Sequence, residues 1–181
     1  QINQICNWVI APADVEHSVK MFAYNIVASL LRELNYVGVI AIEFFYGKNG
    51  LQVNEIAPRT HNSAHYTIEA CSSSQFDQQL CIAAGLPIED PKLLYKGALM
   101  VNLLGLPFIV SMPLERRLSE IGNIDGAYVH WYGKEEEKPG RKLGHVTFLL
   151  NGNTPKDREE EAFQVIRKIR TIWPINAENF V

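Results

Sequence analysis

The sequence has few cysteines, no long apolar run and no excess of basic residues. Its three cysteines, Cys6, Cys71 and Cys81, are an odd number without the close spacing of a metal site. We interpret them as reduced thiols of an intracellular protein rather than a disulfide framework. No apolar run reaches the roughly 18 residues of a membrane-spanning helix, and no signal peptide is recognisable. We therefore expect a cytoplasmic protein with no membrane partner.

The charge balance argues against nucleic acid as a partner. Lys and Arg number 17 and Asp and Glu number 20, which gives a formal net charge of −3. There is no basic tail to bind a phosphate backbone. Apolar residues make up 47% of the 181 residues, which is enough for a packed core in one large domain or two small ones.

The beginning of the chain is unusual. Residue 1 is Gln rather than an initiator Met, and residues 1–12 resemble the end of a strand inside a fold. We expect the sequence to be a fragment that lacks an N-terminal portion.

Hydrophobic periodicity predicts an α+β fold. In the first half we expect a helix from its N-cap Asp14 to Leu34, strands at 37–46 and 51–56 joined by a turn at 47–50, and a helix at 74–84. In the second half we expect strands at 98–104, 128–132 and 144–150, then a helix at 157–172 with Ala162, Val165, Ile166 and Ile169 facing inward. Two prolines between residues 87 and 95 indicate a boundary. We therefore predict domains at 1–90 and 91–181.

Each of the first two strands carries a glutamate among apolar residues. If the loop is residues 47–50, Glu43 lies opposite Asn54, and with one extra loop residue it lies opposite Glu55. Opposite side chains are about 5 Å apart, where two unpaired carboxylates repel each other. A divalent cation removes that repulsion, and oxygen ligands favour Mg²⁺ over zinc or copper. Salt bridges on a solvated face are the alternative, which the apolar neighbours disfavour because they are typical of a strand covered on both sides.

A dense polar run follows the second strand and contains Arg59, His61, Asn62, Ser63 and His65. The guanidinium of Arg59 can bind a carboxylate, bicarbonate or phosphate in a forked geometry. A single histidine is more often structural than catalytic, but two histidines with an Asn and an Arg beside the two glutamates predict a binding site. Zinc at His61 and His65 is disfavoured because no third soft ligand is near.

A second basic cluster surrounds a Gly-containing turn, with Lys134, Arg141, Lys142 and His145 before and within the strand at 144–150. Such cations suit a phosphate, and glycine allows close backbone approach. Taken alone, however, the pattern favours a charged hairpin tip in solvent. We interpret the run Glu135–Glu137 as solvated surface.

Six motifs carry a family resemblance: AIEFF at 41–45, NEIAPRTHNSAHYTIEAC at 54–71, SQFDQQL at 74–80, GALMVNLLG at 97–105, HWYGK at 130–134 and PGRKLGHVT at 139–147. In this order they resemble the N5-carboxyaminoimidazole ribonucleotide synthetases, ATP-grasp carboxylating ligases of purine biosynthesis. The resemblance covers Trp8 to Leu150. Biotin carboxylases differ after the second acidic strand. Formate-using glycinamide ribonucleotide transformylases share the YGK motif and the Arg-rich turn but have D-T-G in place of Asn62-Ser63-Ala64.

The resemblance implies a fold and an activity. Residues 1–90 would be the C-terminal part of an ATP-grasp domain, an antiparallel sheet with helices. Residues 91–181 would be a small β-rich domain with a terminal helix that binds the substrate phosphate. The implied reaction is the ATP- and bicarbonate-dependent carboxylation of 5-aminoimidazole ribonucleotide through carboxyphosphate, with Mg²⁺ as cofactor and a homodimer as the full-length form.

The resemblance also implies residue roles. Glu43 and Glu55 would hold Mg²⁺, with Asn54 and Glu55 at the nucleotide. Arg59 would face bicarbonate or carboxyphosphate, and His61 and Asn62 would line the place where the aminoimidazole meets the carboxyl donor. Lys134, Arg141 and Lys142 would bind the ribonucleotide 5′-phosphate, which replaces the solvated-tip interpretation.

Two departures from the family pattern qualify these roles. Ala64 stands where the family usually has Gly, which we expect to be tolerated unless the backbone needs a positive φ. The family's N-terminal domain and ATP-covering lid have no counterpart in the sequence. The alternatives are therefore a sister ATP-grasp ligase that uses formate and an inactive fragment that is only a stable subdomain.

Overall fold

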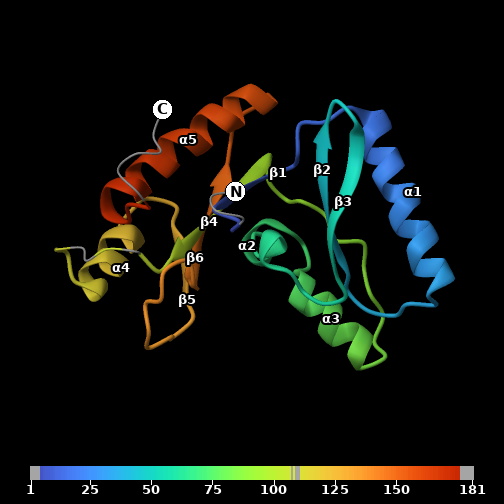
Figure 1. Ribbon diagram of the computed structural model, residues 1–181, viewed down its shortest axis with the longest axis horizontal. Coiled ribbons are helices and arrows are strands. Elements are labelled where there is room, and N and C mark those ends of the chain that lie inside the picture. Colours follow the sequence, from blue (N-terminus) through green and yellow to red (C-terminus); the bar gives the residue numbers. More distant parts are fainter. Residues whose placement is uncertain (1–4, 107, 109–110, 176–181) are drawn as a thin grey trace. The chain divides into compact units, whose positions relative to one another are not determined.

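The computed structural model describes residues 5–106, 108 and 111–175. The chain folds into two compact units, Ala13–Lys92 and Gln1–Pro12 with Leu93–Val181. The expectation about the first residues falls partly on residues 1–4, which lie outside the described residues. Figure 1 labels the helices and strands.

The unit Ala13–Lys92 holds one hairpin and its helices: α1 (His17–Glu33), β2 (Ala41–Gly47), β3 (Gly50–Ala57), the 3₁₀ turn η1 (Asn62–Ala64), α2 (Thr67–Ala70) and α3 (Gln75–Ala83). The predicted N-cap Asp14 is wrong, because Glu16 still has an extended backbone and α1 begins after it. The start of α3 was predicted correctly. Ser74 caps it in a capping box with Asp77, which satisfies backbone donors of the first turn.

The hairpin β2–β3 is more exposed than its apolar sequence predicted. Phe45, Val53 and Ile56 are each about half exposed. Among the described residues the two strands form a sheet of their own, with no third strand beside them. The inference of a strand covered on both sides is therefore wrong for this part of the chain.

The other unit is built on an antiparallel sheet with strand order β1-β4-β6-β5. Its elements are β1 (Trp8–Ala11), β4 (Gly97–Leu104), α4 (Leu114–Gly122), β5 (Tyr128–Trp131), β6 (Lys142–Leu150) and α5 (Pro155–Ile172). Strand β1 pairs with β4. Strand β1 thus joins a sheet made mainly by the second half of the chain. A single domain boundary at residue 90 does not describe this arrangement.

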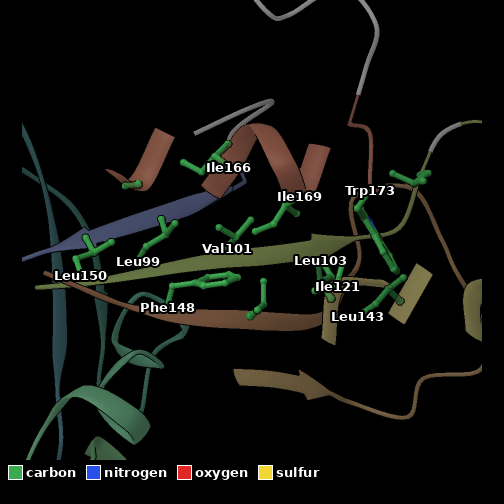
Figure 2. Close-up of a cluster of buried hydrophobic side chains, with 13 residues drawn as sticks. Leu99, Val101, Leu103, Ile121, Leu143, Phe148, Leu150, Ile166, Ile169 and Trp173 are labelled. Atoms are coloured by element: carbon green, nitrogen blue, oxygen red, sulfur yellow. The ribbon is translucent and has the colours of Figure 1, made fainter. Parts of the chain in front are cut away.

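Helix α5 covers one face of this sheet. Figure 2 shows Ile166 and Ile169 of α5 over Leu99 and Val101 of β4. Of the four residues predicted to face inward, Ala162, Ile166 and Ile169 are buried and Val165 is half-buried. Burying this apolar stripe against the strands is what holds the helix in place.

Helix α4 was not predicted, although Leu114, Leu118 and Ile121 stand at helical spacing and pack into the same core.

The fold is α+β, as the sequence predicted. Among the described helices, none is both long and apolar enough to cross a membrane. Cys6, Cys71 and Cys81 form no disulfide.

Candidate functional site

The two glutamates of the hairpin lie directly opposite each other. Next to the turn, Tyr46 lies opposite Leu51. If this register continued along the strands, Glu43 would lie opposite Asn54. The register then shifts by one residue after Phe44, which lies opposite Val53, so that Glu43 lies opposite Glu55. The extra residue is Asn54 in the strand, and not a loop residue. A bulge of this kind redirects side chains at functional sites.

Asn54 also reaches Glu43. Its Nδ2 donates a hydrogen bond of 3.0 Å to Oε2 of Glu43. The Glu43 side chain is 22% exposed and the Glu55 side chain 51%. Both carboxylates are therefore open to solvent or a ligand, rather than buried as the sequence pattern predicted.

His61 lies beside both carboxylates. Its ring nitrogens are 3.8 Å (Nδ1) from Oε1 of Glu43 and 3.9 Å (Nε2) from Oε1 of Glu55, and its side chain is only 9% exposed. The backbone N–H of Ser63 donates to Nδ1 at 3.4 Å. The Ser63 Oγ lies 2.7 Å from the same Nδ1, so Ser63 holds this edge of the ring while Nε2 lies on the side of Glu55.

Gln75, which sequence reasoning missed, fixes the position of His61. Its Oε1 accepts a 2.7 Å hydrogen bond from the His61 backbone N–H, and its Nε2 donates to the His61 carbonyl at 2.9 Å. The same Nε2 lies 2.9 Å from Nδ1 of His65. Gln75 is 8% exposed. Gln75 is the first residue of a capped helix and lies in the SQFDQQL motif, but neither signal carried information about a partner.

Arg59 is the most exposed residue of the cluster. Its side chain is 63% exposed, with Nη2 3.9 Å from Oε1 of Glu55. Asn62 is half-buried at the start of η1. The substitution at Ala64 causes no strain, since it lies in this 3₁₀ turn and Asn35 is the only described residue other than glycine with positive φ.

The donor set fits a magnesium ion. Mg²⁺ is usually held by one or two carboxylates, with phosphate and water oxygens in the other positions. Glu43 and Glu55 supply two opposed carboxylates, with the His61 ring beside both. No cluster of three or more His, Cys, Asp or Glu side chains that could hold a metal occurs among the described residues. The arrangement therefore suits an ion shared with a phosphate ligand better than a site enclosed by protein.

The second predicted cluster lies in the other unit: Lys134 and Arg141 are on the loop between β5 and β6, whereas Lys142 and the buried His145 are in β6. We call residues 132–141 the basic loop. The ammonium of Lys134 donates to the Lys142 carbonyl at 2.5 Å and lies 5.4 Å from the centre of the Tyr132 ring. Arg141 is exposed, and its Nη1 is 3.5 Å from the carbonyl of Glu136. The loop thus presents two cations from opposite ends of one short segment.

Comparison with known families matches both parts of the chain. The profile of the ATP-grasp domain matches residues 1–76. The profile of the phosphoribosylaminoimidazole carboxylase C-terminal domain matches residues 98–159. The glutamate hairpin and its polar run fall in the first match, and the basic loop falls in the second.

Two of the curated relatives illustrate the sequence similarity. The chain is 45% identical over 174 residues to N5-carboxyaminoimidazole ribonucleotide synthase of Synechococcus elongatus, covering 96% of this chain and 44% of the relative. It is 41% identical over 165 residues to the Bacillus subtilis protein of that name, covering 91% of this chain and 40% of the relative. The chain thus spans less than half the length of these relatives.

Solved structures agree with these sequence matches. An ADP complex of N5-carboxyaminoimidazole ribonucleotide synthetase superposes with a TM-score of 0.80 at 36% identity, covering 96% of this chain and 42% of that one. The Aspergillus clavatus enzyme in complex with ADP and 5-aminoimidazole ribonucleotide gives 0.78 at 30% identity, covering 94% and 45%. Two family profiles in order, named relatives and superposed folds show that the chain belongs to the N5-carboxyaminoimidazole ribonucleotide synthase family of ATP-grasp proteins.

Proposed function

We propose that this protein carries out the ATP- and bicarbonate-dependent carboxylation of 5-aminoimidazole ribonucleotide in purine biosynthesis. The observation that carries the proposal is the pair Glu43 and Glu55, opposed across the hairpin with His61 beside both. Relatives solved with ADP and 5-aminoimidazole ribonucleotide support the choice of ligands. The substrates are small molecules, and we include a cytoplasmic location and a homodimeric full-length form in the proposal.

Glu43 and Glu55 are the residues that would hold Mg²⁺, with Asn54 and Glu55 also at the nucleotide. Bound there, the ion would supply positive charge for the oxygens of the transferred phosphoryl group. The hydrogen bond from Asn54 keeps Glu43 in place in the absence of a ligand. Since phosphoryl transfer requires little covalent chemistry from the protein, these residues act by positioning and charge.

Arg59 would bind the bicarbonate that attacks ATP. An oxygen of bicarbonate forms a bond to the γ-phosphorus while the bond to the ADP oxygen breaks, which gives carboxyphosphate and ADP. A guanidinium suits both the reactant and the product because its planar fork matches carboxylate and phosphate oxygens. The exposure of Arg59 leaves that fork accessible.

His61 and Asn62 would line the second step. The exocyclic amine of the ribonucleotide forms a bond to the carboxyl carbon, the carbon–oxygen bond to phosphate breaks, and the amine loses a proton. Free CO₂ released from carboxyphosphate is an equivalent carbon source. The Nε2 of His61 is on the Glu55 side, where, in the tautomer that carries its proton on Nε2, the ring would donate to an oxygen of the carboxyl donor.

Lys134, Arg141 and Lys142 would bind the 5′-phosphate of the ribonucleotide, which assigns residues 91–181 to phosphate binding and 1–90 to the ATP-grasp part. The decisive experiment measures ADP formation by the full-length gene product. We expect ADP release to require both bicarbonate and 5-aminoimidazole ribonucleotide. Formate with glycinamide ribonucleotide in their place should give none.

Two results would contradict the proposal. Formate-dependent turnover would indicate the sister ligase. No heat of binding on titration with Mg-ATP would indicate a protein that is only a stable, inactive subdomain.

A further inference from the structure

One glutamate of the run Glu135–Glu137 does not behave as solvated surface. Both Oε1 and Oε2 of Glu137 accept from Nη2 of Arg117 at 3.0 Å. The Glu137 side chain is 31% exposed, whereas that of Arg117 is 6% exposed. By comparison, Glu136 is 62% exposed and pairs with the exposed Lys138. Glu137 therefore connects the basic loop to a buried cation.

Arg117 is held in place from behind. It belongs to α4, and its guanidinium carbon lies 4.3 Å from the centre of the Trp173 ring. Trp173 is fully buried, and its Nε1 donates to the Leu104 carbonyl at 2.8 Å. Figure 2 shows Trp173 at the end of the sheet where Leu103 and Leu143 lie. Arg117 is thus stacked on a rigid part of the core.

The buried arginine has limited pairing. Its Nε and Nη1 atoms are buried without a hydrogen-bond partner among the described residues. A buried charge is costly unless it is paired, and an arginine that were only structural would gain more from additional partners. Its single carboxylate contact within the described part of the chain is with the basic loop. The burial of Arg117 is therefore better explained by its contact with the basic loop than by a contribution to the stability of the fold.

Backbone hydrogen bonds to Gly105 hold the C-terminal end of the basic loop. The Gly105 N–H donates to the Arg141 carbonyl at 2.8 Å, and the Gly140 N–H donates to the Gly105 carbonyl at 2.9 Å. A Cβ at residue 105 would overlap the Lys138 carbonyl oxygen, so only glycine fits there. With this backbone pair at Gly140 and Arg141 and the ion pair at Glu137, the loop is anchored at its C-terminal end and near its middle.

We propose that Arg117 is a positioning residue, which acts through Glu137 to hold the basic loop so that Lys134 and Arg141 meet the ribonucleotide phosphate together. This inference rests on the proposed function of the loop. Arg117 need not touch the substrate. Arg117 also neutralises the carboxylate of Glu137. This favours anion binding, because the basic loop must attract a phosphate.

The substitution Glu137→Gln tests the inference because two explanations predict opposite results. If Glu137 were only a surface charge, removing a negative charge near a phosphate site would lower the KM for the ribonucleotide or leave it unchanged. If Glu137 holds the loop, the KM should rise about tenfold or more, since small misplacements of binding groups are costly. We expect the KM for ATP and kcat to stay within about twofold.

Matched variants complete the test. Glu135→Gln makes the same chemical change on the exposed neighbour and should lower the ribonucleotide KM slightly or leave it unchanged. Arg117→Lys keeps the charge but loses the fork and should raise the ribonucleotide KM less than Arg117→Met does. If Arg117→Met fails to fold, Glu137→Gln decides alone, because Glu137 lies outside the core.

The outcomes separate this inference from the proposed function. If Lys134→Ala leaves the ribonucleotide KM unchanged, the phosphate assignment of the loop is wrong. If Lys134→Ala raises that KM but Glu137→Gln does not, only the positioning role of Arg117 is wrong. In the double variant Glu137→Gln with Lys134→Ala, the rise in the ribonucleotide KM caused by Lys134→Ala should be much smaller than it is in the parent protein. This result would support coupling between the Arg117–Glu137 ion pair and Lys134.

Discussion

Glu43 and Glu55 face each other across β2 and β3 because Asn54 is inserted as an extra residue in β3. The same inserted residue donates a hydrogen bond to Glu43. One irregularity thus pairs two carboxylates and stabilises one of them. His61, anchored by Gln75, completes the cluster from outside the hairpin. Substitutions at Glu55 and Gln75 therefore test this arrangement separately.

Glu55→Gln should abolish most ADP formation. The substitution keeps the size of the side chain but removes one of the two opposed carboxylates, so charge on the transferred phosphoryl group is less compensated. We expect kcat to fall by about a hundredfold or more, the scale of losing one preorganised electrostatic contact. Steady-state ADP release with bicarbonate and 5-aminoimidazole ribonucleotide measures it.

Glu33→Gln on α1 is the control for Glu55→Gln, since it makes the same change at an exposed residue far along the sequence. It should match the parent protein. A Glu55→Gln variant with a near-parental rate would mean that the metal role of this carboxylate is wrong.

Arg141→Ala should act on substrate binding rather than on chemistry. The guanidinium is exposed on the basic loop and is proposed to bind the 5′-phosphate. We expect the ribonucleotide KM to rise about tenfold or more with kcat nearly unchanged, as when an interaction common to ground and transition states is removed. An unchanged KM would place the phosphate elsewhere.

Gln75→Ala should destabilise the unit Ala13–Lys92. It removes the partners of the His61 backbone N–H and carbonyl and of the His65 ring in a buried place. We expect a loss of about 1–3 kcal/mol in the free energy of unfolding, with lower activity because His61 is no longer held. Urea unfolding measures the loss. Gln52→Ala, at an exposed position of β3, should cost much less.

Asn7→Ala should weaken the other unit. The amide oxygen of Asn7 accepts a hydrogen bond from Arg170, and a second guanidinium nitrogen of Arg170 donates to the Trp173 carbonyl at 3.3 Å. Burial lowers the pKa of Arg170 to about 10, so the side chain remains cationic at neutral pH. Removing Asn7 leaves a buried cation short of a partner, which should cost about 1–3 kcal/mol in thermal or urea unfolding.

The double variant Asn7→Leu with Arg170→Met is the counterpart of Asn7→Ala. Both polar groups are then replaced by apolar ones, which is often close to neutral in a buried site. Stability of the double variant below that of Asn7→Ala would show that the pair matters for more than mutual compensation.

Acid should weaken the caps of α3 and α5. Hydrogen bonds from the backbone N–H groups of Ser74 and Thr154 lower the pKa values of Asp77 and Asp157. A lowered folded-state pKa adds stability above the unfolded-state pKa of about 3.9, and this stability is lost as the pH falls through the folded-state value. We expect unfolding free energy to decrease between about pH 5 and pH 2.

The matched variant for the acid prediction is Asp77→Asn with Asp157→Asn, in which each amide can still accept the cap hydrogen bond but no longer titrates. Its stability should fall less steeply over the same pH range. Identical slopes in the two proteins would mean that these carboxylates do not contribute to acid unfolding.

Periodicity predicted the long elements well and the contacts between them poorly. The capped start of α3 and the inward face of α5 follow from local rules, because capping residues and apolar spacing act within a few residues. Helix α4 had a local signal that was overlooked, whereas the exposure of the hairpin and the pairing of β1 with β4 depend on distant parts of the chain. No short window of sequence contains that information.

The sequence by itself determined which residues gather beside the hairpin. Two glutamates on paired strands must be near each other, and a following run of Arg, His and Asn must lie at the end of the hairpin. Only the tertiary structure decided that Asn54 is the inserted residue, that Gln75 anchors His61, and that Glu137 is tied to Arg117. The physical reason is range, since pairing within a hairpin and helix capping are local, whereas these buried hydrogen bonds and ion pairs join residues that only folding brings together.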